Sequence, residues 1–371
     1  MRKKIVYIIS KLEKSLEYEW LATYLDSTKY ELVFILLNDH KTEFEKFLEI
    51  NQNTFLRINY SGKKQFFKAL NATRKALKKI DPDIINCNLL DANVIGLTAG
   101  KLAGIKRRIY TRHHSDFNFK YSPKGIYYDK WSNYLATEIV AISENVKEIL
   151  TEKEGVNPRK VTVIPYGFSF DEYDSVTEDR VTKIKDKYGI GLSSPIIGVV
   201  SRYVKWKGIP FIIRGFAELL TDYPNAKLVL ANAGHGDDEE NIRKLLQDLC
   251  PDNFVEIDFE NDIAALFKAF DVFVHVPVDR YVEAFGRIYI EALASKTPSI
   301  FTISGIANDF VIDGENARVV KYEDGDSIYQ AMTTILTTKS EEMVINAYND
   351  VKTKFSINKH IELLEEFYDR E

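Results

Sequence analysis

The sequence predicts two α/β domains, each a doubly wound parallel β-sheet covered by helices on both faces. Three observations predict this fold class. The chain has 371 residues, more than a single hydrophobic core usually holds. Short runs rich in β-branched and apolar residues alternate with helical stretches, as they do in βαβ units. The alternation starts again after residue 190 with different residues and no internal repeat, so we expect a second sheet there.

In the first half, the predicted strands are short apolar runs separated by predicted helices. The strand runs are KIVYII (4–9), YELVFILL (30–37), DIINCN (83–88), RRIYTRHH (107–114), EIVAIS (138–143) and VTVIP (161–165). Helical composition marks EYEWLATYLDS (17–27) and KKQFFKALNATRKALKKI (63–80). The basic start MRKKIVYIIS has an apolar part of only about five residues, too short for a signal peptide, so it is predicted as a buried strand.

The second half repeats the pattern. Its predicted strands are PIIGVVS (195–201), AKLVLANA (226–233), NFVEI (253–257), DVFVHV (271–276) and TPSIFT (297–302). A polar, charged stretch over 167–194 is the predicted link between the domains. We therefore predict one domain over 1–170, a second over 171–350, and a C-terminal helix over 351–371 that packs back toward the first domain.

Composition is that of an ordinary globular protein, with 45% hydrophobic and 28% charged residues. No apolar run approaches the roughly 20 residues that span a bilayer. Two distant cysteines match no metal or redox spacing, which favours reduced thiols in a cytoplasm. Residues 1–160 carry 28 Lys and Arg against 19 Asp and Glu, and the remainder carries 22 against 36. The halves either meet different partners or differ in charge without functional meaning.

The loop SRYVKWKGI is predicted to join a strand to a helix. Arg202 and Lys207 lie in this loop, and Gly208 allows the backbone to turn before the helix. Two cations beside a helix N-terminus can bind a diphosphate, because the helix end adds backbone donors and a positive dipole. The alternative is a solvated basic loop.

Two glutamates flank another predicted helix start in YVEAFGRIYIEALASK. A helix from near Phe285 and Gly286 to about Ser295 is expected, with Glu283 before it and Glu291 within it. Helical geometry throughout would separate the two glutamates by roughly 12 Å. Carboxylates at two ends and backbone amides between them suit a sugar–diphosphate–ribose ligand. The alternative makes Glu283 a capping residue and Glu291 an exposed charge.

These segments resemble the family 4 retaining glycosyltransferases over nearly the whole chain. The Glu-x₇-Glu pattern with its Phe-Gly step is similar to the family signature. Five further segments resemble family motifs in the right order: DPDIINCNLLDANVIGLTAGKLAGIKRRIYTRHH (81–114), VTVIPYGFSFDEY (161–173), IIGVVSRYVKWKGI (196–209), LVLANAGHG (228–236) and DIAALFKAFDVFVHV (262–276).

The resemblance implies a GT-B fold, two Rossmann-like domains with the active site between them, and transfer of a sugar from a nucleotide-sugar with retention of configuration. It implies no cofactor and no metal. By matching motifs, Arg202 and Lys207 would hold the diphosphate, Glu291 the ribose, and Glu283 the transferred sugar. The implied catalytic and donor-binding residues are His113, Arg202, Lys207, Glu283, Ala284, Phe285, Gly286 and Glu291.

Several positions depart from the family pattern. The first loop, SKLEKSLEYEW, lacks the usual paired glycines. Tyr166 stands where asparagine is common, and Asn86 and Asn88 where histidines are common. Secondary acceptor-side or donor-side positions are His114, Tyr166, Gly167 and Arg280, although a solvated loop charge is the favoured interpretation of Arg280.

The predicted helix within residues 62–80 carries seven Lys and Arg and no acid, with Phe66, Phe67, Leu70 and Leu77 nearly on one face. Such a helix can lie on an anionic membrane. The alternative is a domain helix whose apolar face packs on the sheet.

We therefore predict a cytoplasmic, metal-independent retaining glycosyltransferase, at the inner face of the cell membrane if the basic helix binds lipid. The expected donor is a UDP-sugar, and the expected acceptor is a glycan, glycolipid or small molecule of bacterial surface polysaccharide assembly; no nucleic acid is expected. The alternatives are a sugar-nucleotide epimerase of similar architecture, which needs no acceptor, and a non-catalytic sugar-nucleotide-binding protein.

Overall fold

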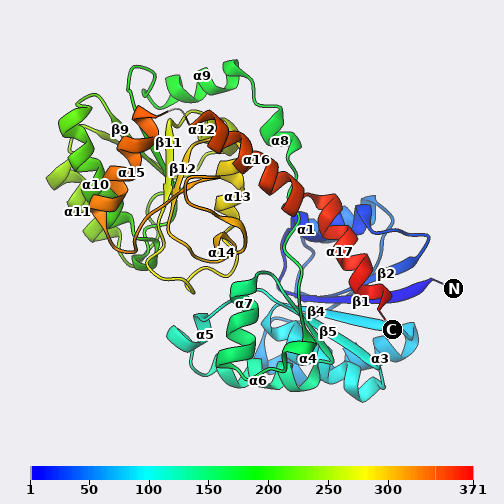
Figure 1. Cartoon of the computed structure of the whole chain (residues 1–371). Helices are drawn as coiled ribbons and strands as arrows, with labels where there is room; N and C mark the ends of the chain where they lie inside the picture. The colour runs from blue at the N-terminus through cyan, green and yellow to red at the C-terminus, as the bar shows by residue number, and fades with distance from the viewer. Residues whose placement is uncertain (1, 339, 371) are drawn as a thin grey trace. The chain divides into compact units, whose positions relative to one another are not determined.

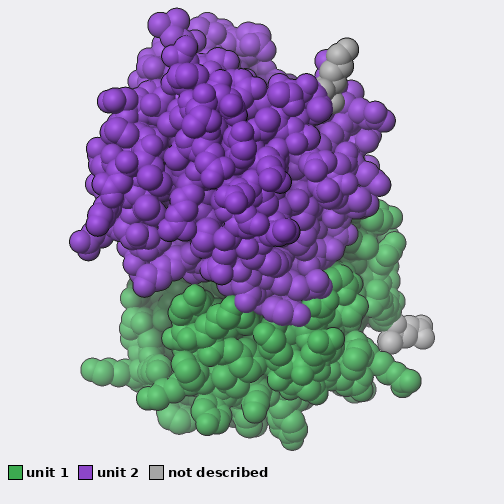
Figure 2. Space-filling view, turned by 60° about the vertical axis from the view of Figure 1, so that its left-hand side comes forward, with its two compact units in different colours: residues 1–167, 357–371 green, residues 168–356 purple. Residues whose placement is uncertain are grey.

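The protein, described here by a computed structural model over residues 2–338 and 340–370, divides into two compact units. Unit 1 comprises residues 1–167 and 357–371, and unit 2 comprises residues 168–356 (Figures 1 and 2). The chain passes from unit 1 to unit 2 after Gly167. The sequence predicted this domain boundary three residues later, after residue 170. Each unit contains one parallel sheet with helices in its crossovers, which confirms the predicted fold class.

The unit 1 sheet has seven parallel strands in the order β3-β2-β1-β4-β5-β6-β7. Strand β1 lies inside this sheet, between β2 and β4, and its apolar run is buried on both faces, as is usual for a strand covered by helices on both sides. The strands are β1 (Lys3–Ser10), β2 (Tyr30–Leu37), β3 (Thr54–Ile58), β4 (Ile84–Asn88), β5 (Arg107–Arg112), β6 (Glu138–Ala141) and β7 (Val161–Val163). The edge strand β3 was not predicted, since its pattern is mostly exposed.

Unit 1 has eight α-helices among its described residues. They are α1 (Leu16–Tyr24), α2 (Glu43–Ile50), α3 (Phe66–Ile80), α4 (Leu90–Ala103), α5 (Phe117–Lys120), α6 (Gly125–Leu135), α7 (Glu144–Glu148) and α17 (Ile357–Asp369). Helix α3 buries Ala69, Thr73 and Leu77, whereas Phe67 at its start is exposed and Phe66 and Leu70 are half-buried, so only part of its predicted apolar face packs inside the unit.

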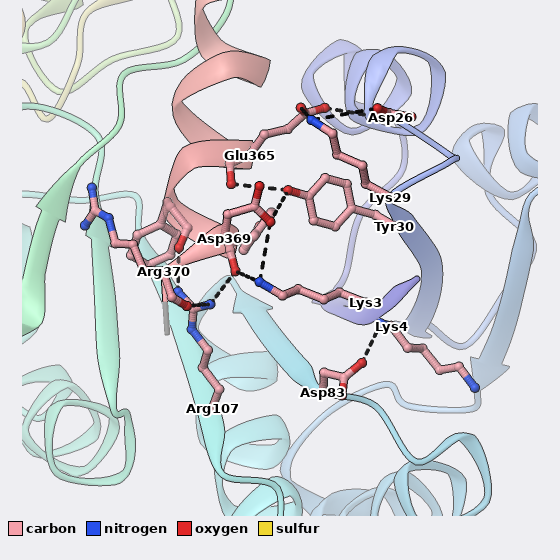
Figure 3. A network of polar contacts seen from close by, with 12 residues as sticks. Lys3, Lys4, Asp26, Lys29, Tyr30, Asp83, Arg107, Glu365, Asp369 and Arg370 are labelled. Atoms are coloured by element: carbon pink, nitrogen blue, oxygen red, sulfur yellow. Dashed lines mark hydrogen bonds and ion pairs between the residues drawn. The ribbon is translucent and has the colours of Figure 1, made fainter. Parts of the chain in front are cut away.

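The C-terminal helix α17 is part of the unit 1 core. Ile361, Leu364 and Phe367 pack with the apolar residues of β1 and β2. Figure 3 shows the end of α17 held by polar contacts: the Arg107 guanidinium donates to the carbonyls of Phe367 and Tyr368 at 2.6 and 2.7 Å. Such donors satisfy carbonyls that a helix end leaves without partners. The predicted segment 351–371 is divided, because its first residues complete α16 in unit 2.

The unit 2 sheet has six parallel strands in the order β10-β9-β8-β11-β12-β13. They are β8 (Ile196–Val200), β9 (Lys227–Ala231), β10 (Phe254–Ile257), β11 (Val272–His275), β12 (Ser299–Phe301) and the unpredicted short β13 (Arg318–Val319). The helices are α8 (Asp171–Asp174), α9 (Glu178–Lys187), α10 (Ile209–Asp222), α11 (Glu239–Leu249), α12 (Ile263–Lys268), α13 (Arg287–Ala294), α14 (Ala307–Phe310), α15 (Gly325–Thr337) and α16 (Glu341–Phe355).

The segment predicted as the link folds mainly as α8 and α9 of unit 2. Arg180 of α9 forms a bidentate ion pair with Asp262, with contacts of 2.6 and 2.9 Å, which attaches α9 to the start of α12. Within residues 2–338 and 340–370, no helix is both long enough and apolar enough to cross a membrane.

Candidate active site

The two predicted donor-binding loops of unit 2 lie side by side at the switch point of its sheet. Strand β8 has β9 on one side and β11 on the other, so the chain winds in opposite directions after β8 and after β11. Ligands of open α/β sheets bind outside the carboxyl ends of the strands at such a point. The backbone confirms the proximity, because Val278 N donates to Trp206 O at 3.0 Å.

The loop after β8 has the conformation that the sequence predicts for a helix start. A 3₁₀ turn, Lys205–Lys207, leads into Gly208, and α10 follows with Pro210 in its first turn. Gly208 has φ +71°, and a Cβ there would lie 2.1 Å from the carbonyl oxygen of Val276. A side chain at this position would therefore push the two site loops apart.

Lys207 and Glu283 form the centre of the unit 2 site. Lys207 Nζ lies 2.5 Å from Glu283 Oε1 and 4.5 Å from the centre of the Trp206 ring. Both charged side chains are largely buried. Arg202 is exposed on the same loop, and its guanidinium has no ion pair or hydrogen bond within residues 2–338 and 340–370. The loop after β8 thus carries a buried, paired lysine and an exposed arginine.

His275, at the end of β11, is the third member of this cluster, and the sequence prediction did not include it. Its Nε2 lies 3.3 Å from Glu283 Oε1. Burial, with the nearby charge of Lys207, lowers the pKa of His275 to about 4. The imidazole is therefore neutral at pH 7, and it donates its Nε2–H to the carboxylate.

Glu283 is a carboxylate across the working pH range. Burial alone would raise its pKa, but Lys207 and the hydrogen bond from His275 outweigh burial and lower the pKa to about 2. Ser304 and Gly305 support the segment from the other side: Glu283 N donates to Ser304 Oγ at 3.3 Å, and a Cβ on Gly305 would lie 2.8 Å from Glu283 Cβ. The carboxylate is thus fixed by a shell of contacts rather than exposed on a mobile loop.

The predicted helix after Glu283 is confirmed as α13, with Gly286 at its N-cap in a left-handed conformation of φ +80°. Because Glu283 precedes this turn, the helical estimate of about 12 Å does not apply to the two glutamates. Ala284 and Phe285 join Glu283 to Gly286, and Phe285 O accepts from Ile306 N at 2.7 Å. The predicted sugar-binding residues therefore form one short segment between β11 and α13.

Glu291, the residue predicted to hold the ribose, lies within α13. Its Oε1 is 3.3 Å from Arg287 Nε, one helical turn earlier. Burial raises the pKa of Glu291, and the Arg287 charge opposes that rise. The side chain retains 20% of its exposure, so it is neither a core residue nor a freely solvated charge.

In unit 1, the predicted active-site residue His113 follows β5 directly. Its Nε2 lies 3.1 Å from Asn88 Oδ1, and its Nδ1 contacts the hydroxyl of Tyr166. Asn88 Nδ2 donates to the carbonyl of Asn86, which fixes Oδ1 toward His113. His113 therefore carries its proton on Nε2, and the Tyr166 hydroxyl donates to Nδ1. Burial and the neighbouring His114 lower the pKa of His113 to about 3, so the ring is neutral.

The departures from the family pattern thus meet around His113. Tyr166 and Asn88 occupy both ring nitrogens, and Asn86 continues the chain of contacts by donating to the Tyr368 hydroxyl at 3.1 Å. Tyr368 belongs to α17 and also contacts the hydroxyl of Tyr7 on β1. The orientation of His113 consequently depends on the helix that returns to unit 1 at the end of the chain.

The secondary positions have different surroundings. His114 Nε2 lies 3.4 Å from Asp129, within a buried polar cluster. Gly167 packs against α17, where a Cβ would lie 3.1 Å from the His360 Cβ. Arg280 is exposed near the Tyr281 ring in the loop after β11, and its carbonyl accepts from Gly305 N at 3.4 Å. His113, His114, Tyr166 and Gly167 belong to unit 1, and the remaining predicted residues belong to unit 2.

A hollow of about 300 Å³ lies at the carboxyl ends of β1, β2 and β3 in unit 1. Its lining includes Glu13 of the glycine-free first loop, together with Asn38, Asp39, His40 and Tyr60. Hydrogen bonds that His40 donates to the Asp39 and Glu13 carboxylates raise the pKa of His40. The first loop therefore presents polar side chains where the family pattern has glycines. Among the residues that the structure describes, no three His, Cys, Asp or Glu side chains are grouped as metal ligands would be.

Two family models match the chain, one on each half. Residues 20–172 match the model described as Glycosyltransferase Family 4, and residues 180–350 match the model described as Glycosyl transferases group 1. The capsular polysaccharide biosynthesis glycosyltransferase CapM of Staphylococcus aureus is 30% identical over 301 residues, 78% of this chain and 77% of CapM. An uncharacterized glycosyltransferase of Methanocaldococcus jannaschii, MJ1069, is 26% identical over 79% of this chain and 76% of its own.

Solved structures show the same architecture. HepE of Anabaena, in complex with UDP, superposes with a TM-score of 0.81 at 19% identity, over 98% of this chain and 99% of HepE. Sucrose-phosphate synthase of Thermosynechococcus elongatus gives a TM-score of 0.75 at 17% identity, over 99% of this chain and 98% of its own. With both halves matched by family models, a relative at 30% identity and two Rossmann-like sheets of GT-B type, the chain belongs to the family 4 glycosyltransferases.

Proposed function

We propose that this glycosyltransferase moves a sugar from a UDP-sugar to a hydroxyl of a glycan or glycolipid acceptor, with retention of anomeric configuration and without a metal ion. The observation that carries the proposal is the cluster of Lys207, Glu283 and His275 beside the start of α10. A cation, a helix start and a fixed carboxylate at a switch point suit a ligand with an anionic middle and a hydroxylated end.

In the proposed reaction, the bond from the anomeric carbon to the phosphate oxygen breaks, and a bond to the acceptor oxygen forms on the same face of the sugar. The acceptor proton passes to the departing phosphate oxygen, so UDP leaves and no protein base is required. Arg202 and Lys207 stabilise the negative charge that develops on the phosphate, since preorganised cations act where charge appears. This clamp would replace a divalent metal.

Glu283 has a positioning role in this proposal. Its carboxylate accepts a hydrogen bond from His275 and pairs with Lys207, which leaves it fixed to accept hydroxyl hydrogen bonds from the transferred sugar. His113 is neutral with a pKa of about 3, so it would orient the sugar or acceptor without transferring a proton near pH 7. The polar hollow lined by Glu13, Asp39 and His40 is the proposed seat of acceptor hydroxyls.

The choice of donor and acceptor is supported by the relatives. HepE was solved with UDP and with UDP-glucose, and CapM is named for capsular polysaccharide biosynthesis. An alpha-monoglucosyldiacylglycerol synthase of Acholeplasma laidlawii is 28% identical over 42% of this chain and 39% of its own. On this basis we propose a UDP-sugar donor and a role in assembly of a bacterial surface glycan or glycolipid.

The test is a donor screen followed by product analysis. Calorimetry with UDP, GDP, ADP and CMP should show tightest binding for UDP, and NMR of the product from the matching α-linked donor should show an α-linkage. Excess EDTA should leave the rate unchanged. A β-linked product would contradict retention, and loss of activity restored by magnesium or manganese would contradict the metal-free clamp. Formation of an epimer without acceptor would favour the alternative epimerase.

Glu291→Gln is expected to raise the Kd for UDP about tenfold, because a charge-assisted hydrogen bond to the ribose is lost. Burial raises the pKa of Glu291, so UDP affinity should also fall on acidification at a higher pH than an ordinary glutamate would give. Calorimetry of UDP binding at a series of pH values from neutral to acidic measures both the change in Kd and its pH dependence. Glu178→Gln, at the first residue of α9, is the control and should bind UDP as the wild type does; equal affinity of Glu291→Gln would contradict the ribose role.

A further inference from the structure

Helix α6 of unit 1 has its polar side chains inside and its aromatic side chains outside. Asp129, Ser132 and Asn133 are buried, whereas Tyr127, Trp131 and Tyr134 are 75%, 46% and 68% exposed. The exposed positions recur at intervals of four and three residues, so they form one stripe along the helix. This distribution is the reverse of the one expected for a helix at the surface of a domain that faces only water.

The buried polar face of α6 explains how the helix is held. Asp129 pairs with Arg112 of β5 at 2.9 Å, and Asn133 donates to Glu154 at 2.7 Å. Glu154 in turn pairs with Arg112 at 2.5 Å. Because the ions are paired and hydrogen-bonded, they fix the orientation of the helix. The aromatic stripe therefore faces outward because the ion pairs and hydrogen bonds of the opposite face hold that face inside the unit.

Neighbouring elements extend the aromatic stripe. Tyr128 is 40% exposed and lines a groove of about 580 Å³ together with Phe66 and Phe67 at the start of α3 and Leu90 and Val94 of α4. Phe117 and Tyr121, in and beside α5, are also exposed. We call the exposed aromatic residues 117–134, with this groove, the aromatic face. A surface with so many exposed aromatic side chains is typical of an interaction site.

Most charges around the aromatic face are positive, and the acid in its groove, Asp91, pairs with Lys11 at 2.8 Å. Lys101 Nζ lies 4.8 Å from the Tyr134 ring and Lys63 Nζ lies 6.0 Å from the Tyr128 ring. Between 117 and 135 the sequence has Lys120, Lys124 and Lys130, and its one acid, Asp129, is buried. Tyrosine and tryptophan accumulate at membrane–water interfaces, and lysine near the surface is attracted by anionic headgroups.

We propose that the aromatic face docks on the interfacial region of an anionic phospholipid bilayer. The predicted basic helix contributes only its start, because Ala69, Thr73 and Leu77 pack inside the unit. Helix α6 supplies most of the aromatic contact, and Lys63, Lys124 and Lys130 supply the attraction for lipid phosphates. The proposal concerns lipid binding and is independent of which sugar the enzyme transfers.

The test uses the full chain with vesicles of phosphatidylcholine alone and with added phosphatidylglycerol. The wild type should float with the anionic vesicles, less with the neutral ones, and less at high salt. Tyr127→Ser with Tyr134→Ser should weaken partition at least about tenfold. Tyr24→Ser with Phe259→Ser is the matched control, since these residues are exposed to 52% and 72% and lie outside the aromatic face.

Several outcomes would overturn the proposal. They are a wild type that stays in solution with anionic vesicles, equal partition of the two double variants, and equal partition into neutral and anionic vesicles. Partition unchanged by Tyr127→Ser with Tyr134→Ser, accompanied by loss of an oligomer in light scattering, would show that a second copy covers the face. Unchanged UDP binding by the double variant shows that the fold and donor site are intact, so this test is separate from that of the proposed reaction.

Discussion

Lys207→Ala is expected to lower kcat/KM by about a thousandfold, as the loss of a preorganised charge at a transition state does. Lys207 is the cation that the structure places next to the buried carboxylate and the start of α10, so it would carry much of the charge on the departing phosphate. Adding Arg202→Ala should reduce transfer to background. Steady-state kinetics with a UDP-sugar, together with calorimetry of UDP, would measure both losses.

The same substitution has a structural effect that must be separated from the chemical one. Without Lys207, the buried Glu283 carboxylate keeps the hydrogen bond from His275 but loses its cationic partner, and an uncompensated buried charge costs about 3 kcal/mol or more. Combining Lys207→Ala with Glu283→Gln removes that charge, so urea unfolding should show recovered stability while transfer stays absent. Lys205→Ala, in the same turn but exposed, is the matched control. Loss of activity in this control, or recovery of transfer in the combined variant, would contradict the assigned role.

The proximity of Lys207 and Glu283 could be predicted because it depends on backbone topology. Apolar runs of the right length mark β8 and β11, and parallel strands bring their carboxyl ends to one edge of the sheet. The turn at Gly208 could likewise be predicted from its residue type, since the left-handed conformation and the close approach to Val276 exclude a side chain there. By contrast, β3 and β13 were missed because an exposed edge strand and a strand of two residues have no apolar pattern.

Side-chain partners were harder to predict, since they depend on residues far apart in the chain. His275 is the last residue of a predicted strand, and only the position of Glu283 shows that its imidazole faces the site. His113 was predicted from its place after a strand, but its contact with Tyr166 joins residues 53 positions apart. Helix α6 has an aromatic pattern that suggests a buried stripe, and only the ion pair of Asp129 with Arg112 shows that the opposite face is buried.

Glu283→Gln is expected to lower kcat by about 10² to 10³ while leaving the Kd for UDP nearly unchanged. The proposed partner of Glu283 is the transferred sugar. The substitution should therefore weaken stabilisation of the transition state and leave nucleotide binding nearly unchanged. Glu291→Gln should show the opposite pattern, with weaker UDP binding and a smaller change in kcat. Comparing the two isosteric variants by kinetics and calorimetry tests the division between sugar and ribose. The same pattern in both variants would contradict that division.

Glu283 should also make the free energy of unfolding depend on pH in the acid range. Its pKa in the folded protein is about 2, against 4.5 for an ordinary glutamate, so the folded state favours the carboxylate. The resulting stabilisation is present above pH 4.5 and is lost as pH falls toward 2, by about 3 kcal/mol for this group. Urea unfolding at stepped pH should therefore show a steeper loss in the wild type than in Glu283→Gln below pH 4.5. Parallel curves would mean that Lys207 and His275 do not hold the carboxylate as the structure shows, and the positioning role would lose its physical basis.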